Sequence, residues 1–139
     1  MSGKAIVLDA NILIRAVLGT RVRELIFDKV TTVKFFTPDV AYTDARKYLP
    51  ALLEKRGIDS SVATLVLDRL EDVIQSIDAE LYEGMQQQAL QRIAVRDVDD
   101  RPVLACAMML GCPVWTEDAD FFGTGVATWT SDRIALYLA

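Results

Sequence analysis

The stretch AIVLDANILI, residues 5–14, decides the fold of this protein. Residues 4–8 are a short and mostly apolar run, as in a β-strand that is buried on both faces. Asp9 ends this run, and residues 11–18 then have the pattern of a helix that Gly19 terminates. We therefore expect a buried strand, an acidic residue at its carboxyl end and a helix directly after it.

The length and composition of the chain fit one folded domain, residues 1–139. Hydrophobic residues make up 52% of the 139 residues, which is enough to build a buried core. No apolar run approaches the roughly 18 residues that a membrane-spanning helix needs. Asp9 and Asn11 interrupt the apolar stretch near the amino terminus, so it does not have the pattern of a secretory signal. We expect a cytoplasmic protein with no membrane segment.

The sequence contains no histidine. This excludes Ser-His-Asp and Cys-His catalysis and metal sites built on histidine. An enzyme of this composition would depend on carboxylates, hydroxyls, Lys and Arg. The oxygen ligands among these groups suit Mg²⁺ or Mn²⁺. The two cysteines, Cys106 and Cys112, lie in apolar segments, and we expect them to be buried hydrophobic residues.

Strand-like and helix-like segments alternate along the chain. The expected strands are residues 4–8, 33–37, 73–77, 113–116 and 126–130. The expected helices are residues 11–18, 21–30, 38–57, 59–73, 78–94, 97–111 and 131–139. This alternation predicts an α/β fold, a parallel sheet with helices on both faces. In such sheets, ligands bind beyond the carboxyl ends of the strands.

Two acidic residues stand at the carboxyl ends of expected strands. Asp9 follows the first strand, and Asp118 follows the strand at residues 113–116. Each has a purely structural interpretation: Asp9 as the N-cap of the next helix, and Asp118 as the first residue of a turn. Both also lie where the sheet would present functional side chains.

Two further acidic residues lie on expected helices. Asp44 flanks the expected buried stripe of the helix 38–57, and it could equally be a boundary residue paired with Arg46 or Lys47. The stripe consists of Ala41, Ala45, Tyr48, Leu49 and Leu52. Asp100 stands near the start of an apolar helix, where Asp97 and Asp99 compete with it for the N-cap position.

Together these acidic residues predict a metal site. The formal net charge of −5 gives no general attraction to nucleic acid, so the acids are either spread over the solvated surface or gathered in one place. Carboxylates gathered at one edge of the sheet would repel one another, and a divalent cation would relieve that repulsion. Such clusters support metal-assisted hydrolysis of phosphodiester bonds.

Three segments resemble the PilT N-terminal (PIN) domain family, and the resemblance extends over nearly the whole chain. They are VLDANILI (residues 7–14), TPDVAYTDARKYL (residues 37–49) and RDVDDRPVLACAMMLGCPVWTEDADF (residues 96–121). The resemblance implies a three-layer α/β/α sandwich with a parallel sheet of four to five strands in the order 3-2-1-4-5. Strands one and four would then be neighbours.

The resemblance also implies which residues form the site. The expected metal ligands and catalytic residues are Asp9, Asp44, Asp100 and Asp118. The expected polar supports are Asn11, Thr116 and Asp120. Asp44 departs from the family pattern, in which a glutamate usually stands at this position, and its side chain is one methylene shorter.

The activity that the resemblance implies is that of a metal-dependent endoribonuclease. Mg²⁺ or Mn²⁺ held by the carboxylate cluster would activate water for the hydrolysis of RNA phosphodiester bonds. Many similar single-domain proteins are toxins of toxin–antitoxin pairs, so the resemblance implies an antitoxin partner that inserts an Arg or Lys among the carboxylates. It also implies a homodimer formed through helices near residues 38–73. Arg15 and Arg46 are the expected RNA phosphate contacts.

Other functions remain open at this point. A haloacid-dehalogenase-like phosphatase would need an aspartate two residues after Asp9, where Asn11 stands. A receiver-like signalling module would need a lysine after the last strand, which ends at Thr130 without one. A catalytically weak PIN-fold module that binds RNA or protein is the main alternative, because Asp44 is shorter than the usual glutamate.

Overall fold

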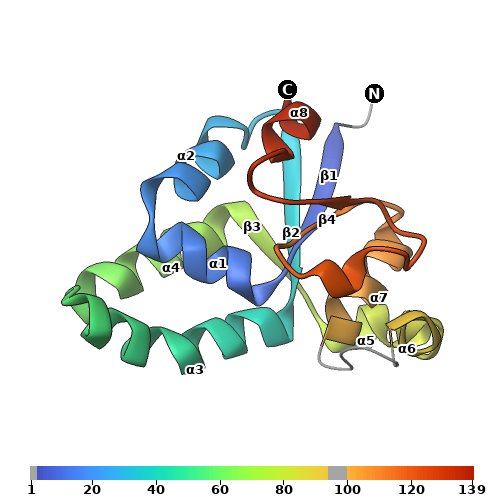
Figure 1. The fold of residues 1–139 in the computed structure, drawn as a ribbon, viewed down its shortest axis with the longest axis horizontal. Coiled ribbons are helices and arrows are strands. Elements are labelled where there is room, and N and C mark those ends of the chain that lie inside the picture. The colour runs from blue at the N-terminus through green and yellow to red at the C-terminus, as the bar shows by residue number, and fades with distance from the viewer. Residues whose placement is uncertain (1–2, 94–99) are drawn as a thin grey trace.

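The computed structural model describes residues 3–93 and 100–139 of the chain (Figure 1). A five-stranded sheet with the order β3-β2-β1-β4-β5 forms its centre, and all neighbouring strands are parallel. The strands are β1 (Lys4–Leu8), β2 (Val33–Pro38), β3 (Ile74–Ile77), β4 (Val114–Trp115) and β5 (Thr128–Trp129). The predicted strand order 3-2-1-4-5 is confirmed.

Helices cover both faces of this sheet, as predicted. They are α1 (Ala10–Leu18), α2 (Thr20–Asp28), α3 (Asp39–Arg56), α4 (Ser60–Val73), α5 (Ala79–Tyr82), α6 (Gln86–Ile93), α7 (Arg101–Leu110) and α8 (Ile134–Leu138). Figure 1 shows α1 to α4 on one side of the sheet and α5 to α7 on the other. The result is a three-layer α/β/α sandwich. Within residues 3–93 and 100–139, no helix combines the length and apolar character needed to cross a bilayer.

The central strand β1 supplies side chains to the cores on both faces. Ile6 and Leu8 pack into the core that contains α1 to α4, whereas Val7 packs into the core under α7. Successive side chains of a strand point to opposite faces, so an unbroken apolar run is what this position requires. This is why the run before Asp9 is apolar at consecutive positions.

One helix prediction differs from the structure. The segment from residue 78 onwards was expected to be one helix, but it consists of α5, a 3₁₀ helix at Glu83–Met85 and α6. Gly84 lies in the 3₁₀ turn. Glycine is a poor helix former because it loses the most backbone freedom on ordering, which gives the physical reason for the interruption.

The register between β1 and β4 positions the candidate site. Leu8 pairs with Trp115, so the next residue of each strand, Asp9 and Thr116, emerges at the same edge of the sheet. The backbone amide of Asp9 donates to the carbonyl of Trp115 at 3.4 Å. A residue that follows β1 therefore meets one that follows β4, although the two are far apart in the chain.

Candidate metal centre

Asp9 is both a helix cap and a residue of the sheet edge. It is buried, with 4% of its surface exposed. Its Oδ1 accepts a hydrogen bond from the Ile12 amide at 3.0 Å, which caps α1 and confirms the structural interpretation of this residue. Its other oxygen, Oδ2, accepts from the hydroxyl of Thr116. Capping therefore uses one oxygen only, and the second faces the end of β4.

Thr116 connects Asp9 to Asp118. Its side chain is fully buried, and its hydroxyl oxygen accepts a hydrogen bond from the Asp118 amide at 3.0 Å while the hydroxyl donates to Asp9. The position of both acidic residues thus depends on one hydroxyl group. This geometry fits the supporting role expected for Thr116.

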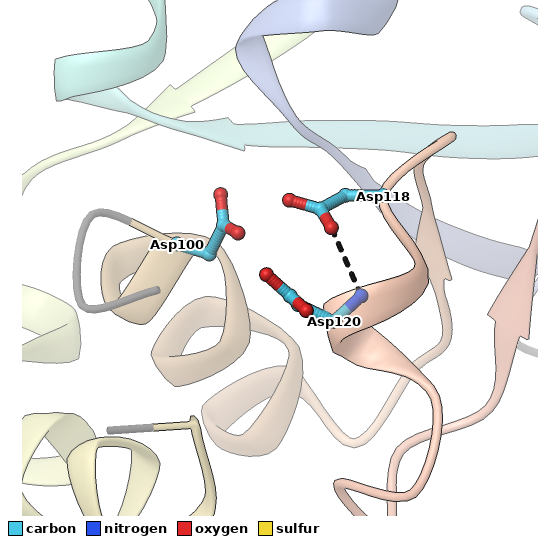
Figure 2. A group of neighbouring side chains, drawn as sticks. All are labelled: Asp100, Asp118 and Asp120. Atoms are coloured by element: carbon cyan, nitrogen blue, oxygen red, sulfur yellow. Dashed lines mark hydrogen bonds between the residues drawn. The ribbon is translucent and has the colours of Figure 1, made fainter. Parts of the chain in front are cut away.

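Three carboxylates come close together beside this connection. Oxygen atoms of Asp100, Asp118 and Asp120 lie within 4.8 Å of one another, and each side chain is partly buried. In Figure 2, Asp100 approaches from the start of α7, while the other two come from the segment after β4. Asp118 Oδ1 accepts from the Asp120 amide at 2.9 Å and caps a 3₁₀ helix, Ala119–Phe121, which confirms the predicted turn. Asp120, expected only as a support, places a carboxylate oxygen within 4.8 Å of oxygens of the other two.

A second set of residues lines a cavity of about 230 Å³ at the same edge. Asp9, Asp44 and Asp100 all line it, so Asp100 belongs to both groups. Asn11 lines it as well and is exposed. Among the larger cavities, one of about 480 Å³ around Gly125 has no acidic residue in its described lining, and one of about 510 Å³ beside β2 and β3 contains Glu71 and Asp72 but none of the expected metal ligands. The chemistry of the smaller cavity, and not its size, identifies it as the candidate site.

Burial raises the pKa of Asp9 to about 6 from its ordinary value of 3.8. That value is the net result: the negative charge of Asp118 also raises this pKa, whereas the hydrogen bonds from Thr116 and Ile12 lower it. Ionised Asp9 is therefore costly in the absence of a cation. A carboxylate in this environment gains free energy when a positive charge binds nearby.

The donor atoms at this edge fit a hard divalent cation. Mg²⁺ and Mn²⁺ prefer carboxylate oxygens, which are the groups that Asp100, Asp118 and Asp120 present. Opposite ligands of Mg²⁺ stand about 4.2 Å apart, twice the metal–oxygen distance of about 2.1 Å. A group of oxygens within 4.8 Å of one another is close to that spacing.

Asp44 lies on α3. Its side chain is exposed, and it lines the cavity together with Tyr48. The expected alternative was a pair with Arg46 or Lys47. In the structure Arg46 bonds to Glu71 and lies 3.6 Å from Asp68, and the Lys47 ammonium lies over the Tyr48 ring.

The two arginines expected to contact RNA lie in different surroundings. Arg15 is exposed on α1, one turn after Asn11. The guanidinium of Arg46 faces the acids of α4 and is not among the residues that line the cavity. Both contacts stay predictions. Of the other residues discussed for this segment, Asp97 and Asp99 lie outside the described part of the chain.

The prediction that Tyr48 belongs to the buried stripe of α3 was wrong. Ala41, Ala45 and Leu49 are buried, but Tyr48 is 53% exposed. The buried residues recur every four positions, and Tyr48 lies four residues after Asp44, on the face that borders the cavity.

Two other residues near the site were not singled out from the sequence. The Thr37 hydroxyl, fully buried, donates to the Leu8 carbonyl at 2.7 Å and so holds the end of β1. Asp39 accepts from the Tyr82 hydroxyl at 2.7 Å and from the Ala79 amide at 3.1 Å, which ties the start of α3 to α5. The sequence did contain a signal for both: Thr37 and Asp39 are polar residues on either side of Pro38, at the end of an expected strand.

The fold and the acidic edge define a class of protein: a parallel α/β/α sandwich with carboxylates gathered beyond its central strands. Residues 7–139 match the PIN domain family, and the chain belongs to that family. A sequence comparison with curated proteins finds no significant match.

Several solved structures share this fold. PAE2754 from Pyrobaculum aerophilum superposes with a TM-score of 0.72 at 13% identity, covering 97% of this chain and 89% of that one. VapBC2 from Rickettsia felis, in a complex with a DNA fragment from their promoter, superposes with a TM-score of 0.65 at 11% identity, covering 91% of this chain and 98% of that one. FitAcB from Neisseria gonorrhoeae superposes with a TM-score of 0.60 at 20% identity, covering 91% of this chain and 97% of that one. At these identities the likeness establishes the fold alone.

Proposed function

We propose that this protein is a metal-dependent endoribonuclease. The observation that carries the proposal is the position of Asp100, which lines the same cavity as Asp9 and Asp44 and also lies within 4.8 Å of Asp118 and Asp120. Membership of the PIN domain family and the absence of histidine from the sequence both favour metal-assisted hydrolysis over histidine-based catalysis. The RNA substrate, the metal and the catalytic residues are all part of this proposal.

In this proposal the chain's own residues bind the cation and orient the substrate. Asp9, Asp44, Asp100, Asp118 and Asp120 would hold Mg²⁺ or Mn²⁺. When bound, such a cation lowers the pKa of water and stabilises negative charge on a phosphodiester. Thr116 would keep Asp9 and Asp118 in place through its two hydrogen bonds, and Asn11 would present a polar group to the cavity. Arg15 would contact a backbone phosphate, whereas Arg46 could do so only after leaving its acidic neighbours on α4.

The partners are also proposals. VapBC2 and FitAcB, whose structures share this fold, support the inference that the protein acts as a cytoplasmic toxin with an antitoxin. An antitoxin could place the positively charged side chain of an Arg or Lys beside Asp100. That side chain would then take the place of the metal ion among the carboxylates. A homodimer through α3 and α4 remains part of the same proposal.

A cleavage assay tests the enzymatic function. The wild-type protein is incubated with single-stranded RNA in Mn²⁺, in Mg²⁺ and in EDTA, beside Asp100→Asn and the matched control Asp28→Asn, which changes an exposed aspartate on α2. We expect cleavage only with metal, unchanged activity for Asp28→Asn, and a loss for Asp100→Asn. That loss should exceed the about 10- to 100-fold typical of residues that merely support metal ligands. Equal cleavage by wild type and Asp100→Asn would contradict the proposal, and a lack of any metal effect would favour a binding module.

A further inference from the structure

Tyr48 places an exposed aromatic ring beside the carboxylates. It lines the cavity together with Asp9, Asp44 and Asp100, and 53% of its surface is exposed. Asp44 and Tyr48 are four residues apart on α3, so their side chains are neighbours on one face of the helix. Single exposed apolar residues are common on protein surfaces. Tyr48 differs from them in its place at the candidate catalytic cavity.

A positive charge accompanies this ring. The Lys47 ammonium lies 5.3 Å from the centre of the Tyr48 ring, which is a cation–π arrangement. The protein is acidic overall, and this ammonium is a positive charge that would attract a nucleic-acid backbone locally. An aromatic face next to a positive charge is the combination by which proteins hold single-stranded nucleic acids.

We propose that Tyr48 stacks against an unpaired base of the RNA while Lys47 attracts the adjacent phosphate. The inference rests on the proposed function and specifies its substrate: RNA that is single-stranded where it enters the cavity. The base would contact the face of the ring opposite the Lys47 ammonium. In a duplex the bases are stacked on one another, so a paired substrate offers no free base to this ring.

The first test compares variants of the ring. The kcat/KM for cleavage of a short single-stranded RNA is measured for wild type, Tyr48→Ala and Tyr48→Phe, with Leu136→Ala, another exposed side chain, on α8, as control. Binding of the same RNA to these variants in an Asp100→Asn background gives a readout that does not depend on cleavage. We expect Tyr48→Ala to lose about 5- to 150-fold, the range for one stacked base. Tyr48→Phe and Leu136→Ala should stay near the wild-type value.

The second test identifies the stacked base. One nucleotide at a time in the RNA is replaced by an abasic nucleotide, and the series is measured with wild type and with Tyr48→Ala. Stacking predicts one position at which the abasic change weakens the wild type but has no effect on Tyr48→Ala. An equal loss in both proteins at every position would overturn the inference, because Tyr48 would then act only through α3 or through a protein partner.

The outcomes separate this inference from the proposed function. If wild type cleaves RNA with metal and Asp100→Asn does not, but Tyr48→Ala equals wild type, the stacking inference alone is overturned. Cleavage of a hairpin stem as efficient as that of the single strand would also overturn it alone. If the wild-type protein neither cleaves nor binds RNA under any metal condition, both proposals fail together.

Discussion

The hydroxyl of Thr116 donates a hydrogen bond to the buried carboxylate of Asp9, 107 residues earlier in the chain. The contact exists because β1 and β4 are neighbours in the sheet and because Leu8 pairs with Trp115, so both residues leave their strands at the same edge. It joins the first strand of the fold to the segment that carries Asp118.

Replacing Thr116 with valine should weaken both the fold and the metal site. Valine keeps the shape but removes the hydroxyl, so the Asp118 amide loses its acceptor and Asp9 loses a donor. We expect the free energy of unfolding to fall by about 2–3 kcal/mol, the cost of leaving buried polar groups unsatisfied. Without this donor the pKa of Asp9 should rise further, which would weaken Mn²⁺ binding. Urea unfolding and Mn²⁺ titration measure the two effects. Thr116→Ser keeps the hydroxyl, so a Mn²⁺ affinity as low as that of valine would contradict this account.

Asp9→Asn should stabilise the metal-free protein at neutral and alkaline pH. The pKa of about 6, against an ordinary value of 3.8, corresponds to about 3 kcal/mol of unfavourable ionisation at high pH. A weakened bond to Thr116 offsets about 1 kcal/mol of this. We expect a net gain of about 1–2 kcal/mol at pH 8, measured by urea unfolding in EDTA.

The free energy of unfolding of the wild-type protein should depend on pH in a way that Asp9→Asn does not share. In the wild type the folded protein binds a proton at Asp9 at a higher pH than the unfolded chain does, so its stability increases as the pH falls from about 6 to about 4. Asp9→Asn lacks this contribution, and its advantage should therefore shrink through the same window. A difference that stays constant from pH 8 to pH 4 would show that ionisation of Asp9 is not the cause.

Mn²⁺ should raise the melting temperature of the wild-type protein. A cation that binds only the folded state stabilises it by about 2.7 kcal/mol at a concentration 100 times the dissociation constant. We expect this shift to disappear in Asp100→Asn, since Asp100 belongs to both groups of carboxylates, and to persist in Asp28→Asn. Differential scanning fluorimetry with increasing Mn²⁺ measures it. Equal shifts in all three proteins would place the binding elsewhere.

Asp44→Glu should strengthen the site. Asp44 is exposed at the cavity and is one methylene shorter than the glutamate usual in the family, so the longer side chain extends further toward the other carboxylates. We expect several-fold tighter Mn²⁺ binding and faster RNA cleavage, with a stability change within about 0.5 kcal/mol because the position is exposed. Asp44→Asn should have the opposite effect on binding. If both variants match the wild type, Asp44 does not belong to the site.

Tyr82→Phe should destabilise the protein without affecting the metal response. The Tyr82 hydroxyl is buried against the Asp39 carboxylate, and hydrogen bonds to charged groups contribute about 1.5–3 kcal/mol. Tyr137→Phe is the matched control, because it removes a hydroxyl that donates to the neutral Ala5 carbonyl at 2.8 Å and should cost only about 0.5–1.5 kcal/mol. Urea unfolding compares the two. A smaller loss for Tyr82 than for Tyr137 would show that Asp39 is not the charged acceptor inferred here.

The sequence alone was enough to predict the α/β class, the strand order through the family resemblance and the acidic edge of the sheet. The class and the acidic edge depend on local pattern: a short apolar run that ends at Asp9, within an alternation of strand-like and helix-like segments, predicts a buried strand. The absence of histidine likewise excludes imidazole ligands, and this conclusion follows from composition without any knowledge of the fold. The short 3₁₀ turn around Gly84 was missed because one glycine within an otherwise helical pattern does not by itself end a helix.

Tertiary structure alone decided how the acidic residues are grouped. Sequence separation carries no information on which oxygens meet, so the closeness of Asp120 to Asp100 and the double role of Thr116 follow only from the strand register and the packing of α7. The sequence likewise did not determine the exposure of Tyr48, because its position in the helical pattern was compatible with burial. Its exposure was decided by which face of α3 the core covers, and that face leaves the ring at the cavity beside Asp44.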